Sequence, residues 1–251
     1  MAIAFITGVT SGIGEATAKL FAKNKYQLII TGRRKERLDA LSEALKKEYA
    51  IEVLRLNFDV RNLKEVEAAV QSIPDKWKKI DVLVNNAGLA VGMNPIQEGV
   101  VDDWERMIDT NIKGLLYITR TIAPIMIEKG GGHIVNIGSI AGKEVYANGN
   151  VYCATKHAVD ALNRGMRIDL LPHHIRVTGI HPGMVETEFS IIRFKGDEQR
   201  AKNVYTGLQA LSAEDIADTV YWAVSRPAHV NITDIIITPT AQANATTTVR
   251  K

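Results

Sequence analysis

The two residues of this sequence best suited to acid–base chemistry are a tyrosine and a lysine one helical turn apart. Tyr152 and Lys156 lie in "NVYCATKHA", residues 150–158, which is otherwise typical of an ordinary helix. A tyrosine, with a pKa near ~10, is a poor proton donor at neutral pH. An ammonium group one turn away should stabilise the phenolate and lower that pKa. The pair could then exchange a proton with an oxygen atom that gains charge, although the same spacing also occurs on solvated helix faces.

A serine could assist this pair. Ser139 directly follows the apolar run "HIVNIG", so its hydroxyl could hydrogen-bond a substrate oxygen and hold it beside Tyr152. The alternative role is a turn cap, which is common for serine. Cys153 has no assignable partner base, and we interpret it as a small packed residue. The six histidines lack ligand-like spacing, so we expect no metal site.

Glycines near the N-terminus form a second feature with chemical potential. "TGVTSGIG" places Gly8, Gly12 and Gly14 between an apolar run and a helical segment. Glycines allow the backbone to approach a pyrophosphate closely, and the N–H groups at the start of the helix can bind it. Glycine also serves ordinary turns, but at the first strand-to-helix connection the pattern favours a dinucleotide.

Two arginines predict which dinucleotide is bound. About 20 residues beyond the glycines, NAD-binding folds place an acidic residue on the ribose hydroxyl. This chain has Arg33 and Arg34 there, and a guanidinium pairs with a phosphate. With Lys35 they begin a helix, where positive charge is unfavourable unless an anion is bound. We therefore predict that the cofactor is NADP, and that Thr10 and Ser11 also donate hydrogen bonds to its phosphate. The alternative is that the two arginines are a solvated pair on a loop.

Alternating strands and helices must position these residues. Most of the strand candidates are apolar at nearly every position, as strands buried on both faces of a parallel sheet are. The pattern predicts one α/β domain over residues 1–251, a Rossmann-type doubly wound parallel seven-stranded sheet with helices on both faces. Residues 183–210 show no clear strand or helix, which is typical of a substrate loop. The strand candidates are residues 2–7, 26–31, 51–56, 80–85, 133–138, 175–180 and 232–238.

Composition narrows the class of partner. The 31 basic and 28 acidic residues leave a net charge of +3, which does not indicate nucleic acid or a membrane surface. We therefore expect a small-molecule substrate. The single cysteine cannot form an internal disulfide, and the N-terminal apolar run is interrupted at Gly8. We therefore expect a cytoplasmic protein.

Four separated motifs resemble those of the short-chain dehydrogenase/reductase family over nearly the whole chain. They are "TGVTSGIG", "NNAG" at residues 85–88, the serine after "HIVNIG", and "YCATK". The resemblance implies an oxidoreductase acting on CH–OH groups, with Asn111, Ser139, Tyr152 and Lys156 as catalytic residues. In the family this asparagine holds a water molecule that links the lysine to solvent. The cofactor-binding residues, from the resemblance and from the patterns above, are Gly8, Thr10, Ser11, Gly12, Ile13, Gly14, Arg33, Arg34, Asp59 (at the adenine), Val60, Asn86, Ala87, Gly88, Tyr152, Lys156, Pro182, Gly183, Val185 and Thr187.

Longer segments resemble one branch of this family. "DWERMIDTNIKGLLYITR", "GNVYCATKHAV", "EFSIIRFKGDE" and "PAHVNI" are similar to NADP-dependent 3-hydroxy acid dehydrogenases, which include serine and allo-threonine dehydrogenases and malonic semialdehyde reductases. This implies interconversion of a small 3-hydroxy acid and the 3-oxo acid or semialdehyde. Arg193 could clamp the carboxylate, with Ser139 and Tyr152 also binding substrate, although pairing with nearby acidic residues is an alternative. Other readings are a 3-oxoacyl carrier-protein reductase, a general carbonyl reductase, or a non-catalytic NADP-sensing protein.

One segment bears on assembly. Residues 111–128, "NIKGLLYITRTIAPIMIE", are apolar around more than one helical stripe. A helix with one solvated face has a narrower apolar stripe. We predict that another subunit covers part of it, in the homotetramer that is usual for the family.

Overall fold

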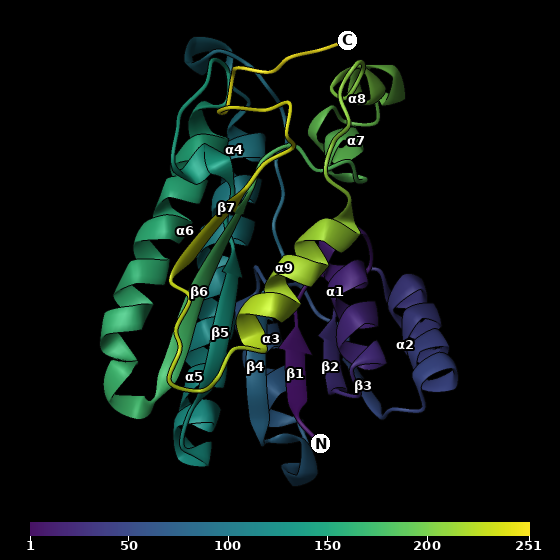
Figure 1. Ribbon diagram of the computed structural model, residues 1–251, viewed down its shortest axis with the longest axis vertical. Coiled ribbons are helices and arrows are strands. Elements are labelled where there is room, and N and C mark those ends of the chain that lie inside the picture. The colour runs from purple at the N-terminus through teal and green to yellow at the C-terminus, as the bar shows by residue number, and fades with distance from the viewer.

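Seven strands form one sheet at the centre of the protein, as a computed structural model describes for residues 1–251 (Figure 1). All neighbouring strands are parallel, in the order β3-β2-β1-β4-β5-β6-β7. Each strand candidate is confirmed within three residues at either end. The strands are β1 (Ile3–Ile6), β2 (Gln27–Thr31), β3 (Val53–Leu56), β4 (Ile80–Asn85), β5 (Gly132–Ile137), β6 (Ile175–Pro182) and β7 (Asp234–Ile237).

Helices cover both faces of this sheet, which confirms the predicted fold class. α1, α2 and α9 pack on one face, and α3, α5 and α6 on the other. The shorter helices α4, α7 and α8 lie beyond the carboxyl ends of the strands (Figure 1). The helices are α1 (Gly12–Lys23), α2 (Lys35–Tyr49), α3 (Leu63–Gln71), α4 (Val101–Ile108), α5 (Leu115–Lys129), α6 (Asn150–Asp169), α7 (Phe189–Arg193), α8 (Glu198–Asn203) and α9 (Ala213–Val224).

Alternation along each strand divides the core into two layers. In β1, Phe5 faces the layer beneath α5, whereas Ile6 faces the layer beneath α1. Both side chains are fully buried, as is Phe21 of α1. Burying one such side chain stabilises the fold by about 1.5–3 kcal/mol. The two layers hold the sheet rigid, and its parallel strands all end at the same edge.

The segment predicted as an irregular substrate loop contains two helices, which corrects that prediction. We call residues 183–210 the lid. α7 and α8 are five and six residues long, too short for an apolar period to be visible in the sequence. Lys195 and Gly196 between them both have positive φ, so the chain turns sharply there. The lid lies over the carboxyl edge of the sheet (Figure 1).

The broad apolar surface of α5 is partly explained within the chain. Tyr117, Ile125 and Ile127 are half-buried and pack against the core that α3 and β4 share. Leu116 stays 38% exposed. Coverage of this helix by a second subunit therefore stays a prediction. No helix of the chain combines the length and the hydropathy that crossing a bilayer requires.

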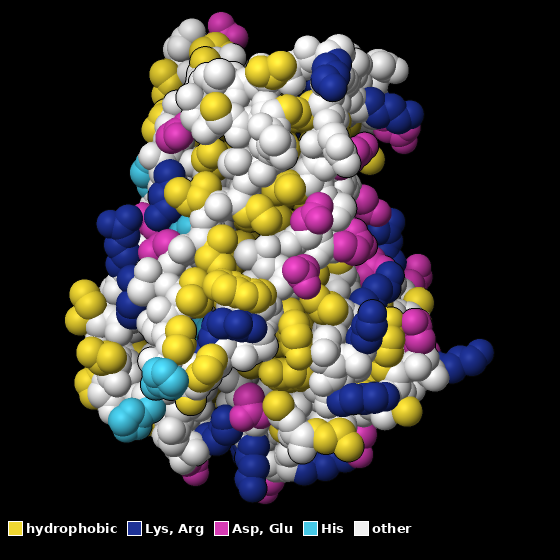
Figure 2. Space-filling view, viewed as in Figure 1, with side chains coloured by type: hydrophobic (Ala, Val, Ile, Leu, Met, Phe, Trp, Pro, Cys, Tyr) yellow, Lys and Arg dark blue, Asp and Glu magenta, His cyan; other side chains and the backbone are white.

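Charged groups of both signs are mixed over the surface. On the face in Figure 2, lysine and arginine side chains alternate with aspartate and glutamate, and apolar groups lie between them. This distribution agrees with the small net charge of +3. On this face it offers no single-sign patch of the kind that binds nucleic acid.

Candidate active site

A cavity of about 620 Å³ opens at the carboxyl edge of the sheet, beneath the lid. It brings together residues from the glycine turn, the strand ends, α6 and the lid. Most of the predicted site residues line it, whereas Gly14, Asp59 and Asn111 do not. The predicted residues on its wall are Gly8, Thr10, Ser11, Gly12, Ile13, Arg33, Arg34, Val60, Asn86, Ala87, Gly88, Ser139, Tyr152, Lys156, Pro182, Gly183, Val185, Thr187 and Arg193.

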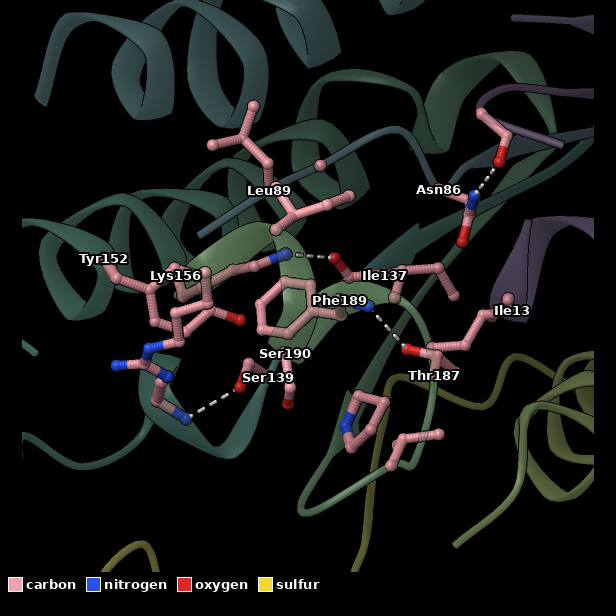
Figure 3. Close-up of a pocket in the computed structure, with 18 of the residues that line it drawn as sticks. Ile13, Asn86, Leu89, Ile137, Ser139, Tyr152, Lys156, Thr187, Phe189 and Ser190 are labelled. Carbon is pink, nitrogen blue, oxygen red and sulfur yellow. Dashed lines mark hydrogen bonds between the residues drawn. The ribbon is translucent and has the colours of Figure 1, made fainter. Parts of the chain in front are cut away.

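The glycine turn is shaped as a cradle that side chains would block. Gly8 has a φ of +70°, and a Cβ there would lie 2.9 Å from the Cα of Ala87. Gly14 lies behind the wall, where a Cβ would lie 2.4 Å from both Asn86 Nδ2 and the carbonyl oxygen of Gly8. Asn86, which Figure 3 shows at this end of the cavity, fixes this contact by donating to the carbonyl oxygens of Thr7 at 2.8 Å and of Gly8 at 3.1 Å. The exposed start of α1 fits a pyrophosphate.

Arg34 joins the glycine turn to the lid. It lies at the N-cap of α2, and its guanidinium donates to Thr10 Oγ1 at 3.0 Å and to Ser11 Oγ at 2.7 Å. Its third contact is the carboxylate of Glu188, at 2.9 Å, and Arg37 pairs with the same carboxylate at 2.8 Å. An anion therefore already sits where the sequence predicts a phosphate. The residues that make these contacts are therefore suited to bind the 2′-phosphate of NADP.

Asp59 lies off the cavity wall. Its carboxylate accepts hydrogen bonds from Arg61 at 2.9 and 2.7 Å, and Arg33 lies 3.4 Å away. Although burial alone would raise it, these hydrogen bonds and charges hold the pKa of Asp59 below its ordinary value. The carboxylate thus orients Arg33, which lines the cavity, and Arg61, which lies outside it. Its contact with adenine stays a prediction from the resemblance.

Ser139, Tyr152 and Lys156 converge at the other end of the cavity (Figure 3). Ser139 lies two residues beyond the end of β5 and caps the short 3₁₀ turn η4 (Ile140–Gly142), with Oγ accepting from the Ala141 N–H at 3.1 Å. The turn-cap role considered for this serine is therefore confirmed, and its substrate-binding role stays a prediction. Tyr152 and Lys156 are 9% and 7% exposed, on the first turns of α6. The lysine Nζ donates to the carbonyl oxygen of Ile137 at 2.9 Å.

The electrostatics of this pair correct one prediction. Burial raises the pKa of Tyr152 well above its ordinary value, while Ser139 and Arg193 lower it by less. Burial also lowers the pKa of Lys156 to about 8. The expected lowering of the tyrosine pKa by this lysine is wrong for this structure, because desolvation of the phenol dominates and the ammonium bonds to a carbonyl group. The lysine is therefore the group of the pair that titrates near neutral pH.

Asn111 lies behind the wall in a π-helical segment, η3 (Asp109–Gly114), which joins α4 to α5. It is 2% exposed, and its amide bonds to both the N–H and the carbonyl of Leu89 at 2.8 Å. A Cβ on Gly88 would lie 3.3 Å from Asn111 Oδ1 and 3.6 Å from Lys156 Nζ. The asparagine and the lysine thus both lie beside Gly88. The π-helical segment that carries the asparagine is of a kind that often occurs at functional sites. Its water-holding role stays a prediction.

The lid brings a cation and an aromatic ring to the catalytic tyrosine. The guanidinium carbon of Arg193 lies 5.5 Å from the ring centre of Tyr152, and its Nη2 donates to Tyr146 Oη at 2.9 Å. The Nε of Arg193 is buried without a hydrogen-bond partner. Phe189 packs on Tyr152 with ring centres 5.8 Å apart. Tyr146 is a further residue of the site that no motif predicts, since its only signal in the sequence is its place between the serine and tyrosine motifs.

Comparisons with known proteins agree with this geometry. Residues 2–197 match the family of short chain dehydrogenases. The chain is 49% identical to the NADP-dependent 3-hydroxy acid dehydrogenase of Salmonella typhi over 97% of both proteins. It is 43% identical to the serine 3-dehydrogenase of Agrobacterium fabrum, over 96% of this chain and 94% of that protein.

A solved structure extends this likeness to three dimensions. The closed form of serine dehydrogenase complexed with NADP+ superposes with a TM-score of 0.92 at 46% identity, covering 99% of both chains. The serine dehydrogenase of Escherichia coli has a TM-score of 0.82 at 41% identity, covering 96% of this chain and 99% of that one. The likeness therefore extends over nearly the whole chain.

Proposed function

The chain belongs to the short-chain dehydrogenase family, and we propose that it is an NADP-dependent oxidoreductase that interconverts a small 3-hydroxy acid and the 3-oxo acid or semialdehyde. The names of the relatives suggest 3-hydroxy acids such as serine as substrates, and the resemblance to this branch of the family adds the allo-threonine and 3-hydroxypropionate types. The observation that carries the proposal is the guanidinium of Arg193, held over the ring of Tyr152 in the cavity that also contains the glycine cradle.

Residues of the glycine turn and of α2 would hold the cofactor. The pyrophosphate would lie at the start of α1, where N–H groups and the helix dipole favour an anion. Arg34, with Thr10 and Ser11, would hold the 2′-phosphate, because the guanidinium already gathers both hydroxyl groups by donating a hydrogen bond to each. When bound, NADPH supplies the hydride that reduces the substrate carbon.

The proton comes from the protein. The Tyr152 hydroxyl donates it to the substrate oxygen, and the Ser139 hydroxyl holds that oxygen in place. The raised pKa keeps the tyrosine protonated until negative charge develops on the substrate oxygen, which is then the stronger base and takes the proton. Lys156, with a pKa of about 8, can carry a positive charge beside the developing phenolate or pass on a proton. In the oxidation of a hydroxy acid the same groups act in reverse.

Arg193 would make the site prefer substrates that carry a carboxylate over neutral ones. A guanidinium binds a carboxylate through two parallel hydrogen bonds, and the Nε that lacks a partner could supply one of them. In a 3-hydroxy acid, one CH₂ or CH group separates the carboxylate from the reacting carbon. The guanidinium of Arg193 lies over the ring of Tyr152, so the arginine and the tyrosine hydroxyl would hold the two ends of such a molecule. A 3-oxoacyl carrier-protein reductase, the alternative, would give this half-buried cation no charged partner.

We also propose that the enzyme is a cytoplasmic homotetramer. The support is the family's usual assembly and the apolar side chains that α4 and α5 leave exposed, Ile108 at 37% and Leu116 at 38%. Light scattering coupled to gel filtration tests the assembly. A mass of four chains is expected, and a monomer at micromolar concentration would contradict it.

A comparison of kcat/KM for an acid and for its methyl ester tests the proposed function. Wild-type enzyme should oxidise L-serine, allo-threonine or 3-hydroxypropionate with NADP+, read from the absorbance of the reduced cofactor. The methyl ester of the same acid is the matched control, and we expect its kcat/KM to be lower by about 10-fold or more, since a hydrogen bond to a charged group contributes ~1.5–3 kcal/mol. Equal rates for acid and ester, or a preference for an acyl thioester, would contradict the proposal. Absence of turnover with any of them would support the NADP-sensing alternative.

A further inference from the structure

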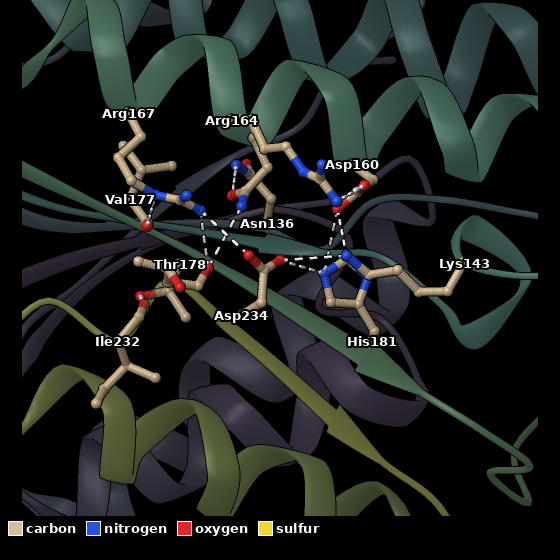
Figure 4. Close-up of polar contacts among 12 residues, drawn as sticks. Asn136, Lys143, Asp160, Arg164, Arg167, Val177, Thr178, His181, Ile232 and Asp234 are labelled. Atoms are coloured by element: carbon tan, nitrogen blue, oxygen red, sulfur yellow. Dashed lines mark hydrogen bonds and ion pairs between the residues drawn. The ribbon is translucent and has the colours of Figure 1, made fainter.

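A cluster of charged side chains lies behind the catalytic end of the cavity and takes no part in its wall. We call Lys143, Asp160, His181 and Asp234 the buried ion cluster (Figure 4). His181 is fully buried and Asp160 is 8% exposed. Charged groups that are buried this deeply need oppositely charged or hydrogen-bonding partners. The contacts within the cluster therefore constrain the positions of the strands, turn and helix that carry these side chains.

A lysine lies at the centre of this cluster. Lys143 Nζ is 2.5 Å from Asp160 Oδ1 and 3.5 Å from Asp234 Oδ1. His181 Nε2 lies 2.8 Å from the same oxygen of Asp234 and donates to it. Two carboxylates and an imidazole could also ligate a metal ion. Here the ammonium fills the position between the carboxylates, so the cation of the cluster belongs to the chain itself.

The lysine and Asp160 connect the serine turn to the catalytic helix. Lys143 directly follows η4, the turn that Ser139 caps. Asp160 lies one turn after Lys156 on α6. The turn and the helix are in backbone contact, because a Cβ on Gly142 would lie 2.5 Å from the carbonyl oxygen of Lys156. The ion pair therefore clamps the two elements whose side chains must meet at the substrate oxygen.

His181 connects the same turn to the cofactor wall. It immediately precedes Pro182 and Gly183 of the cavity. A Cβ on Gly138, the residue before Ser139, would lie 2.5 Å from His181 Nδ1. That nitrogen is buried without a hydrogen-bond partner. The imidazole thus supports the backbone beneath the serine by packing, while Asp234 of β7 fixes the ring.

We propose that Lys143 is a positioning residue, which bridges Asp160 and Asp234 and thereby sets the place of the Ser139 hydroxyl relative to Tyr152. The inference rests on the oxidoreductase function proposed above. Each carboxylate has a second cation at its outer side, Arg164 on Asp160 at 2.8 Å and Arg167 on Asp234 at 3.4 Å. Loss of the lysine therefore removes the bridge without leaving either carboxylate unpaired.

Three substitutions at this position test the inference. Lys143→Met keeps the apolar stem and removes the charge, whereas Lys143→Arg restores the charge and Lys143→Gln keeps a donor. Lys76→Met is the matched control, since that lysine pairs with Glu52 on the surface away from the cavity. Small displacements of a reacting group can cost up to about 100-fold in rate. We expect Lys143→Met to lower kcat about 10-fold or more, with NADPH affinity within about twofold of wild type.

The readout separates positioning from folding. Active sites are counted by fluorescence titration with NADPH, and kcat is expressed per bound cofactor. We expect Lys143→Arg to recover most of the rate, Lys143→Gln to be intermediate, and Lys76→Met to match wild type. An unchanged kcat per site in Lys143→Met would overturn the inference, as would the absence of any recovery in the arginine variant. If Lys143→Met does not fold, the arginine and glutamine variants decide by the same criterion.

The test is independent of the exact substrate. Wild-type turnover is measured first, with the 3-hydroxy acids and with a neutral ketone. If only the ketone is used, the 3-hydroxy acid proposal fails, but the ratio of variant to wild-type kcat on the ketone still tests Lys143.

Discussion

The two sides of the cavity are held by different kinds of contact. On the catalytic side, Ser139 caps the turn η4, Tyr152 and Lys156 stand on α6, and the buried ion cluster fixes these two elements from behind. On the other side, the lid is tied down at its first turn by exposed ion pairs. Glu188 and Arg34, which join the lid to the glycine turn, are about 40% exposed.

The difference shows which part of the site is preorganised. Exposed ion pairs contribute ~0–1 kcal/mol and weaken with salt. Buried pairs contribute little net stability, but they are costly to break and therefore hold one geometry. The catalytic side is thus set before a substrate arrives. The lid can exchange its partners: Glu188 pairs with Arg34, and Arg193, the carboxylate clamp that we propose, lies over the ring of Tyr152.

The largest effect on the lid side is expected from Arg193→Met. It removes the proposed carboxylate clamp, and kcat/KM for a 3-hydroxy acid should fall by about 10- to 100-fold, because hydrogen bonds to charged groups contribute ~1.5–3 kcal/mol. Steady-state kinetics on the acid and on a neutral ketone measure it. The ketone should change by less than about threefold, since only the charged contact is lost.

Arg200→Met is the control for this change. Its guanidinium stacks on Phe194 in the same lid, 4.5 Å from the ring centre, and does not line the cavity. We expect wild-type kinetics. An equal loss on acid and ketone in Arg193→Met would mean that the arginine supports the fold of the lid and does not select the substrate.

The next effect concerns cofactor choice. Arg34→Gln removes a guanidinium that already contacts Thr10 and Ser11, so the dissociation constant for NADPH should rise about 10-fold while that for NADH stays unchanged. Fluorescence titration with both cofactors measures the two constants. Arg37→Gln, which loses only its pairing with Glu188, is the matched control. An equal rise in the dissociation constants for NADPH and NADH would show that Arg34 does not contact the 2′-phosphate.

A pH profile probes the catalytic side. Burial lowers the pKa of Lys156 to about 8, so its ammonium is present below this pH and is lost above it. The raised pKa of Tyr152 keeps the phenol protonated over the same range. For reduction of the 3-oxo acid, kcat/KM should therefore fall above about pH 8, approaching tenfold per pH unit for one proton. In Lys156→Arg the fall should move to higher pH, since arginine stays charged. An identical profile in both enzymes would exclude the lysine as the titrating group.

The smallest effect is expected from Glu188→Gln. Its carboxylate shares Arg34 and Arg37, and these cations hold its pKa below the ordinary value. Removing this exposed negative charge should tighten NADPH binding by no more than about threefold, and the gain should vanish in high salt. Titrations at low and high ionic strength measure it. A gain of tenfold or one that persists in salt would show that the lid contacts are as rigid as the catalytic side.

The features that show as local patterns of residue types could be predicted from the sequence. The strands are visible because burial on both faces leaves continuous apolar runs, and the glycine turn because its residue types are dictated by backbone geometry. Tyr152, Lys156 and Ser139 were found by their spacing and by family motifs. Arg193 was found because it interrupts an apolar segment.

Features made by contacts between distant residues could not be predicted. Lys143 and Asp234 are 91 positions apart, and Tyr146 meets Arg193 across 47, so no local pattern marks either pair. The helices of the lid are too short to show a period. The direction of the Tyr152 pKa shift was missed because spacing reveals a neighbouring charge but not the depth of burial.

The central claim is that the Tyr152 hydroxyl delivers the proton within a preformed catalytic wall. Single-turnover kinetics of Tyr152→Phe with bound NADPH test it most directly, because phenylalanine keeps the ring contact with Phe189 and removes only the hydroxyl. We predict that the variant binds NADPH as wild type does, while the rate of cofactor oxidation falls by about 10²- to 10⁴-fold. Retention of more than about a tenth of the wild-type rate would contradict the account.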